Sequence, residues 1–211
     1  MPRTYPRVLA VIALAFSVLC GVGTPASAQY FGRNKVQYRD LDFQVLKTEH
    51  FDIYFYASEQ EGVDIAARLA ERWYARLSKL LNHTLSERQP LVLYASHADF
   101  EQTNTILNFL PEGIGAFALP SRNRMVLPID IPDEKLAQLI AHELTHVFQF
   151  EILFGGNYIR AQTTNAPQWF TDGMASYFGN DEDNKDRMVL RDAVLADQVP
   201  DRQQAVQASQ R

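Results

Sequence analysis

A five-residue segment in an apolar stretch contains two histidines and a glutamate, whose side chains can hold a metal ion and use it in catalysis. His142-Glu143-Leu144-Thr145-His146 has the HExxH pattern, with two histidines four residues apart. On an α-helix this spacing puts both rings on one face, one turn apart. Neutral imidazoles bind Zn²⁺ at about 2.0–2.1 Å. Glu143 lies beside the pair, and its carboxylate is predicted to be a general base rather than a ligand. The alternative is an ordinary helix whose histidines are satisfied locally.

A third metal ligand is expected downstream of the histidines. A catalytic zinc site commonly has three protein ligands and one open position. Asp172 is the leading candidate, because it lies in the segment WFTDGMASY, where Gly173 and Ala175 would let a second helix pack closely on the first. Glu151 is a poorer candidate, since nine positions from His142 it falls on the opposite side of the same helix.

The two segments together resemble a known family. HELTH followed by WFTDGMASY resembles the gluzincin metallopeptidases, and more closely the bacterial peptidase MA-like domain. The resemblance covers almost all of the chain after its leader, including FGRNKVQYRDLDFQVLKTEHFDIYFY and YASHADFEQTN. It implies that His142 and His146 are zinc ligands and that Glu143 is the base.

One position departs from the pattern of that family. Its second helix typically has the sequence W-[FL]-x-E-G-x-A-x-Y, so Asp172 stands where the family places a glutamate ligand. Aspartate is one methylene shorter, and its oxygen falls short by roughly 1–1.5 Å unless the second helix moves inward. Relatives often continue into a TolB-like β-propeller, and the resemblance implies a possible propeller domain that is missing from this chain.

The remaining pattern predicts an α+β fold. We expect a zincin-like domain with a small mixed sheet, an active-site helix that carries HExxH and a second helix that carries the third ligand. Apolar alternation and helical periodicity predict the elements, which are strands within 43–56, a helix over 59–81, a strand over 91–95, a hairpin within 113–129, and helices over 133–152, from 167 to about 177, and over 188–197.

Local signals place the ends and faces of the HExxH helix. Asp133 is predicted to cap its start, and Gly155 begins the Gly-Gly-Asn stretch that ends it. Its buried stripe is expected to consist of Leu136, Ile140, Leu144, Val147 and Ile152. The hairpin before it resembles the edge strand on which zincins hold an extended substrate, with residues 115–119 as the candidate, although a plain core hairpin fits equally well.

The N-terminus predicts export. Arg3 and Arg7 precede an apolar run over residues 8–22, and Ala26-Ser27-Ala28 is a suitable cleavage site. We therefore expect a signal peptide over 1–28, a peptidase MA-like domain over 29–199, and a disordered tail over 200–211. The expected location is the periplasm or the exterior, with no transmembrane segment after cleavage. An uncleaved membrane anchor is the alternative.

Composition narrows the classes of partner. The 211 residues are 46% hydrophobic and 21% charged, which suits one globular domain. The only cysteine is Cys20, so cleavage after Ala28 leaves no disulfide or thiolate ligand. Loss of two arginines lowers the formal charge from -5 to -7, which argues against nucleic acid as a partner.

The expected function follows from the motif and the resemblance together. We expect an exported Zn²⁺-dependent metallopeptidase, with a peptide or protein as substrate. One alternative is a catalytically weak or inactive zincin-fold module that binds partners in the cell envelope. Another is a metal-dependent hydrolase of a different bond, such as an amide in cell-wall peptide. Tyr177, His97 and Tyr158 are possible oxyanion donors, but we expect packing or surface roles for them.

Overall fold

The computed structural model describes residues 41–56, 60–103, 113–119, 123–164, 166–179 and 184–208. The contacts divide the chain into residues 1–36 and 37–211, and the first unit lies wholly outside the described residues. The predicted signal peptide therefore falls outside them too.

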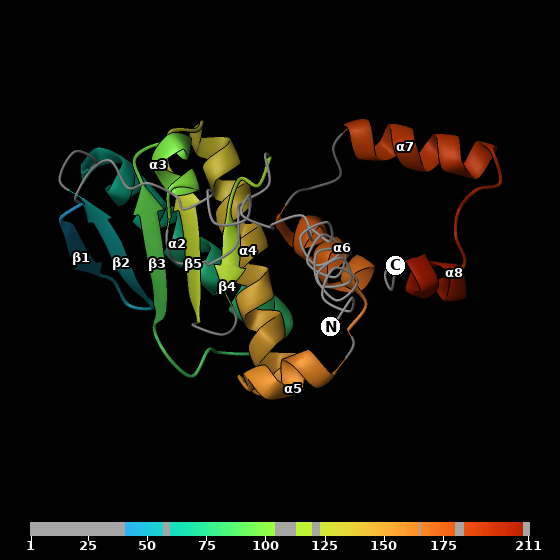
Figure 1. Ribbon diagram of the computed structural model, residues 1–211, viewed down its shortest axis with the longest axis horizontal. Helices are drawn as coiled ribbons and strands as arrows, with labels where there is room; N and C mark the ends of the chain where they lie inside the picture. The colour runs from blue at the N-terminus through green and yellow to red at the C-terminus, as the bar shows by residue number, and fades with distance from the viewer. Residues whose placement is uncertain are drawn as a thin grey trace, which may run out of the picture. The chain divides into compact units, whose positions relative to one another are not determined.

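The described strands form one mixed five-stranded sheet in the order β1-β2-β3-β5-β4 (Figure 1). β1 (Phe43–Lys47) pairs antiparallel with β2 (Phe51–Tyr56), which pairs parallel with β3 (Gln89–Tyr94). β3 pairs parallel with β5 (Arg124–Pro128), and β5 pairs antiparallel with the edge strand β4 (Phe117–Leu119). The expected small mixed sheet and the α+β class are confirmed.

Two long helices cover one face of this sheet. α2 (Gln60–Leu81) and α4 (Asp133–Phe154) pack against each other and against the inward side chains of the strands. Phe51, Ile53, Leu91 and Met125 are wholly buried in this layer. Burial on this face explains the apolar periodicity of both helices, and it fixes α4 to the sheet.

The other face of the sheet has a smaller apolar cluster. Tyr56, Val92, Tyr94 and Val126 are buried there with Phe100 of the short helix α3 (His97–Glu101). Ser96 caps α3 by accepting the backbone N–H of Asp99 at 3.2 Å. The larger core therefore lies on the α2–α4 face.

Four more helices follow α4 in the chain. α5 (Tyr158–Thr163), α6 (Gln168–Gly179), α7 (Asn184–Leu195) and α8 (Arg202–Ala208) are all described. α6 and α7 were expected, whereas α5 was predicted as loop. The Asn157 side chain accepts the N–H of Arg160 at 3.0 Å and begins α5, which is a local cap that the periodicity did not reveal.

The C-terminal segment also differs from expectation. We predicted a disordered tail over 200–211, but Arg202–Ala208 form α8. Asp201 accepts the N–H of Gln204 at 2.8 Å, and the Gln204 side chain accepts the N–H of Asp201 at 2.9 Å. This reciprocal pair is a capping box, which starts a short helix without apolar periodicity.

Two expectations for α4 were wrong. Pro132 occupies the cap position and makes no side-chain hydrogen bond, whereas Asp133 lies in the first turn. The Asp133 carboxylate therefore stabilises the helix start only through its attraction to the helix dipole. Ile152 is 44% exposed although Phe150 and Phe154 are buried, because it lies five positions after Val147 and so points away from the buried stripe. Gly155 does end the helix in the left-handed conformation, with φ of 61°.

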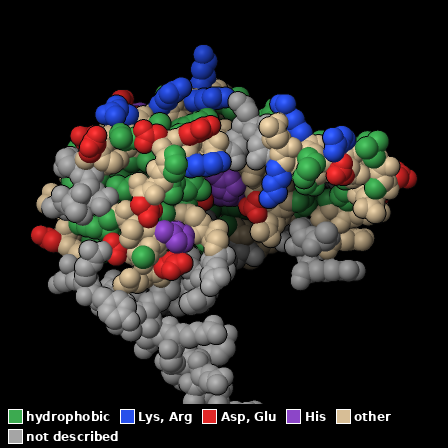
Figure 2. All heavy atoms as spheres, turned by 90° about the horizontal axis from the view of Figure 1, so that it is seen from above, with side chains coloured by type: hydrophobic (Ala, Val, Ile, Leu, Met, Phe, Trp, Pro, Cys, Tyr) green, Lys and Arg blue, Asp and Glu red, His purple; other side chains and the backbone are tan. Residues whose placement is uncertain are grey.

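The surface of the described residues shows mixed charge. In Figure 2 both acidic and basic side chains are present on the visible face, with most of the basic ones toward its upper edge. Among the described helices, none combines the length and the apolar character needed to cross a membrane.

Candidate metal centre

The two histidines of the HExxH motif lie side by side on α4. The Nε2 atoms of His142 and His146 are 3.2 Å apart, and the rings are 4.8 Å apart between centroids. Two ligand atoms at 2.0–2.1 Å from a tetrahedral zinc would be about 3.3–3.4 Å from each other. The pair therefore has the spacing of two metal ligands, and the same distance also suits an N–H···N hydrogen bond.

Asp172 approaches this pair from α6. Its Oδ1 atom lies 3.6 Å from Nε2 of His146, and its side chain is 46% exposed. A tetrahedral site would hold a nitrogen and an oxygen ligand about 3.4 Å apart. The separation from His146 therefore fits a shared metal closely, despite the shorter aspartate side chain.

The three side chains do not yet form a complete site. Within the described parts of the chain, no group of three or more histidine, cysteine or carboxylate side chains is arranged so that it could hold a metal ion. Two distances between these side chains fit a tetrahedral zinc ion, namely that from His146 to His142 and that from His146 to Asp172.

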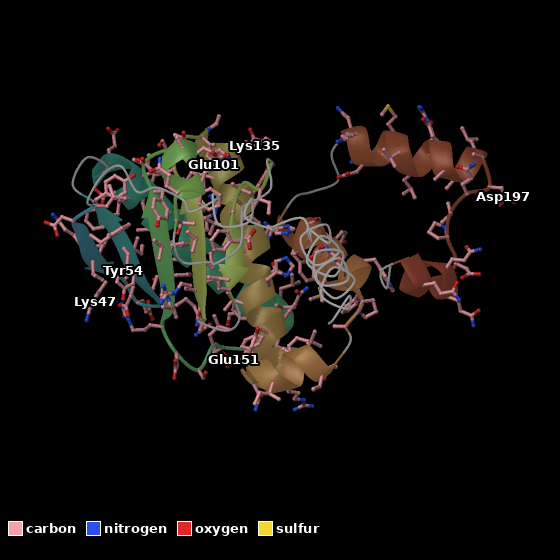
Figure 3. The ribbon with its side chains drawn as sticks, viewed as in Figure 1. Lys47, Tyr54, Glu101, Lys135, Glu151 and Asp197 are labelled. Carbon is pink, nitrogen blue, oxygen red and sulfur yellow. The ribbon has the colours of Figure 1, made fainter. Side chains whose placement is uncertain are left out.

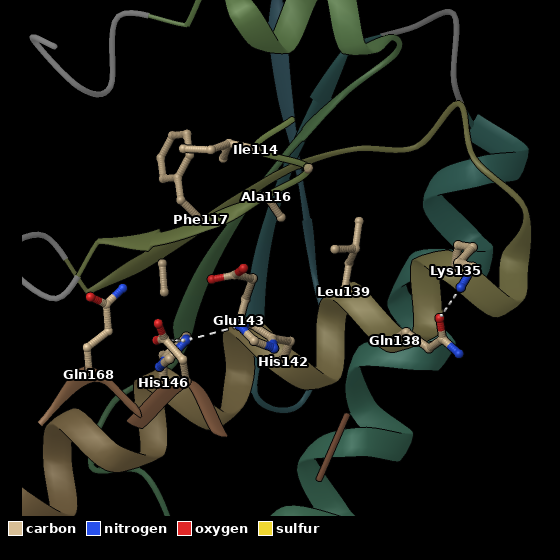
Figure 4. Close-up of a pocket in the computed structure, with 13 residues that line it drawn as sticks. Ile114, Ala116, Phe117, Lys135, Gln138, Leu139, His142, Glu143, His146 and Gln168 are labelled. Carbon is tan, nitrogen blue, oxygen red and sulfur yellow. Dashed lines mark hydrogen bonds and ion pairs between the residues drawn. The ribbon is translucent and has the colours of Figure 1, made fainter. Parts of the chain in front are cut away.

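Glu143 is buried between α4 and the edge strand. Its side chain points toward the strand side of the cleft in Figure 4, and the residue is only 6% exposed. Burial is the main reason that the pKa of Glu143 rises to about 7; a backbone hydrogen bond from Ala118 opposes this rise, and the nearby Asp172 charge adds to it. A carboxyl group with this pKa can both accept and release a proton near neutral pH.

The protonation of His142 suits metal binding. Burial lowers the pKa of His142, as does the neighbouring His146, while Asp172 acts in the opposite direction. A lowered pKa keeps the imidazole neutral near pH 7, which is the form that binds a metal. His146 in turn meets the Gln149 side chain, with 2.9 Å between Nδ1 and Oε1.

Small residues allow α6 to approach α4 closely. Ala175 is fully buried, and a Cβ atom added at Gly179 would lie 3.0 Å from the backbone nitrogen of His142 and 3.2 Å from the carbonyl oxygen of Gln138. A Cβ at Gly173 would meet nothing within 4 Å. Of the two small residues expected to permit close packing, Ala175 has this role and Gly173 does not.

A cleft of about 710 Å³ runs along the site. Its described walls are α4, the start of α6, and the segment that leads into β4. Phe117 and Ala118 line it from the edge strand, and Lys135 lies at the end of the cleft near the start of α4. The predicted strand at 115–119 therefore borders the site, with β4 forming its last three residues.

The rejected candidates lie elsewhere. Glu151 accepts the N–H of Ser86 at 2.9 Å and contacts His83 at 3.2 Å, so it holds the loop after α2. Figure 3 shows it toward the opposite end of α4 from Lys135. Tyr177 is 69% exposed, and the His97 ring contacts Glu101 at 3.4 Å.

Sequence reasoning missed two contributors to the site. Gln149 lies three residues after His146, a spacing that brings side chains together on a helix and so was available as a signal. The Ala118 backbone hydrogen bond to Glu143 had no such signal, because it depends on how the edge strand is positioned over α4.

Comparison with known proteins adds little. No family model matches the chain, and no solved structure matches it significantly. Over 153 residues, 68% of this chain, it is 25% identical to an uncharacterized protein of Treponema pallidum (strain Nichols). The match covers 13% of that protein, so the chain spans a small part of the length of its relative. Neither a family nor an activity follows from this similarity.

Proposed function

We propose that this chain is an exported zinc-dependent metallopeptidase of the gluzincin type, with a zincin-like fold. The observation that carries the proposal is the contact of 3.2 Å between His142 and His146 directly beside a buried glutamate. The sequence resemblance to peptidase MA-like domains agrees with it. His142, His146 and Asp172 would hold the zinc ion.

Each residue would have a distinct task in peptide hydrolysis. When bound, zinc would polarise the scissile carbonyl group and make a water molecule more acidic. Glu143 would take the proton from that water and deliver it to the departing amine, and a pKa near 7 suits both transfers. The described sheet has β4 at its edge, so one side of this strand offers backbone groups to an extended peptide.

A zinc measurement with two variants tests this proposal. We expect purified wild-type protein to hold about one zinc per chain by plasma mass spectrometry after dialysis, and to hydrolyse casein. Glu143→Gln should keep the metal and lose at least about 100-fold in rate, since it removes the general base. His146→Ala should lose both. A wild type without stoichiometric zinc would sink the proposal.

A binding module is the second candidate function. It is favoured by the finding that no three described side chains form a finished metal site. Such a module would use the cleft to bind a peptide without cleaving it. It predicts that peptide binding is the same for the wild type and Glu143→Gln, and that neither hydrolyses casein, whereas the peptidase predicts cleavage by the wild type alone.

A further inference from the structure

Gln149 connects the two helices of the candidate metal centre. It lies on α4, three residues after His146, and is only 3% exposed. Its Oε1 atom lies 2.9 Å from Nδ1 of His146, and its Nε2 atom donates to the carbonyl oxygen of Thr171 at 2.9 Å. One buried side chain thus contacts a histidine of α4 and the backbone of α6.

These two bonds fix the orientation of the amide. A carbonyl oxygen can only accept, so the side of Gln149 that faces Thr171 must be the NH₂ group. Oε1 therefore faces His146, and Nδ1 of that ring must carry the proton that it accepts. In a neutral His146 ring with its proton on Nδ1, the lone pair is on Nε2. Nε2 is the atom that faces His142 and Asp172.

The bond to Thr171 acts on the other side of the site. Thr171 directly precedes Asp172 in the first half of α6, so a bond to its carbonyl group restrains the backbone that carries the carboxylate. Elsewhere α6 contacts α4 through the small residues Ala175 and Gly179, which permit close approach, and Phe178 packs against the main core. The directional hydrogen bond from Gln149 further restrains the sliding and rotation of α6.

We infer that Gln149 is a positioning residue that sets the tautomer of His146 and holds Asp172 at its distance from that histidine. The inference rests on the proposed zinc site. It adds a residue that connects α4, which carries the two histidines, with α6, which carries Asp172. Hydrogen-bond partners behind a metal ligand typically contribute 10–100-fold to metal affinity. Gln149 contributes in this way to two ligands, to one directly and to the other through the helix that carries it.

Gln149→Leu removes both bonds and keeps a side chain of similar size. We expect its zinc affinity, measured by competition with a chromogenic chelator, to fall 10–100-fold. In the metal-free protein, amide hydrogen exchange in α6 should become faster, which can be measured without any activity. Gln102→Leu is the matched control, because this glutamine lies at the end of α3 and donates its side-chain hydrogen bond to the Ala98 carbonyl oxygen at 3.0 Å, outside α4 and α6. It should change neither value.

Gln149→Glu separates the two bonds. Its carboxylate can still accept from His146 but has no proton for the Thr171 carbonyl. We expect α6 to exchange as fast as in Gln149→Leu, with a smaller loss of zinc affinity. This variant also decides the question if Gln149→Leu does not fold.

The outcomes separate the two proposals. If the wild type binds zinc but the Gln149 variants match its affinity and its exchange within twofold, the inference is overturned and the proposed function stands. If the wild type binds no zinc, the proposed function is overturned and the inference falls with it. A zinc-binding wild type with weakened, faster-exchanging variants supports both.

Discussion

The two helices that face the cleft are held in the protein in different ways. α4 has 11 buried residues among 22, whereas α6 has two buried residues among 12. α4 is therefore fixed by the core beneath it, while α6 lies at the edge of that core and is held mainly by its contact with α4. His142, Glu143 and His146 lie on the firmly held helix, and Asp172 lies on the other.

This difference separates the parts of the site by what sets their geometry. The spacing of the two histidines follows from the helix itself, because residues four apart are one turn apart. The distance from His146 to Asp172 is instead set by how α6 packs, and any change at that contact alters it. We expect the position of Asp172 relative to His146 to be the most easily perturbed feature of the candidate site.

The largest expected effect concerns the core under α4. Ile140→Ala removes a fully buried side chain and should lower the free energy of unfolding by about 2–5 kcal/mol. Ile152→Ala, on the same helix but 44% exposed, should cost less than about 0.5 kcal/mol. Urea unfolding of the metal-free protein measures both. Equal losses would contradict the view that α4 is fixed by one buried face from which Ile152 points away.

The second prediction concerns the buried base on α4. Glu143 has a pKa of about 7 when folded and 4.5 as its ordinary value, so its contribution to stability is present below pH 4.5 and lost as the pH rises to about 7. Glu143→Gln avoids this loss. From pH 5 to pH 8 we expect the metal-free variant to gain up to about 3 kcal/mol in unfolding free energy relative to the wild type.

A control for this measurement is built into the comparison of the two proteins. The lowered pKa of His142 means that its contribution is lost as the pH falls below 6.5, which is the opposite direction. Because His142 is present in both proteins, most of its effect cancels in the difference. A difference that does not change between the two pH values would show that Glu143 is not buried as described.

The third prediction concerns the contact between α6 and α4. Gly179→Ala places a Cβ atom 3.0 Å from the His142 backbone, which cannot move without shifting the metal centre, and should cost about 1–3 kcal/mol. Gly173→Ala has open space and should stabilise by up to about 1 kcal/mol through helix propensity. Thermal unfolding reports both, and the same sign for the two variants would argue against a close helix contact at Gly179.

Much of the fold could be predicted because its signals are local and periodic. The apolar spacing of α2 and α4 and the alternation in β2 each match a buried face that the structure has. Ile152 was assigned to the buried stripe of α4, but it lies five positions after Val147 and points away from the core. α5 and α8 were missed because side-chain caps, at Asn157 and Asp201, begin them without an apolar stripe.

The sequence by itself determined the composition of the candidate site and the relation between His142, Glu143 and His146, since the geometry of one helix relates them. Only the tertiary structure decided the distance from His146 to Asp172, the burial that raises the pKa of Glu143, and the link through Gln149. These features depend on contacts between segments that are distant along the chain. Their values come from packing, which helix periodicity does not specify.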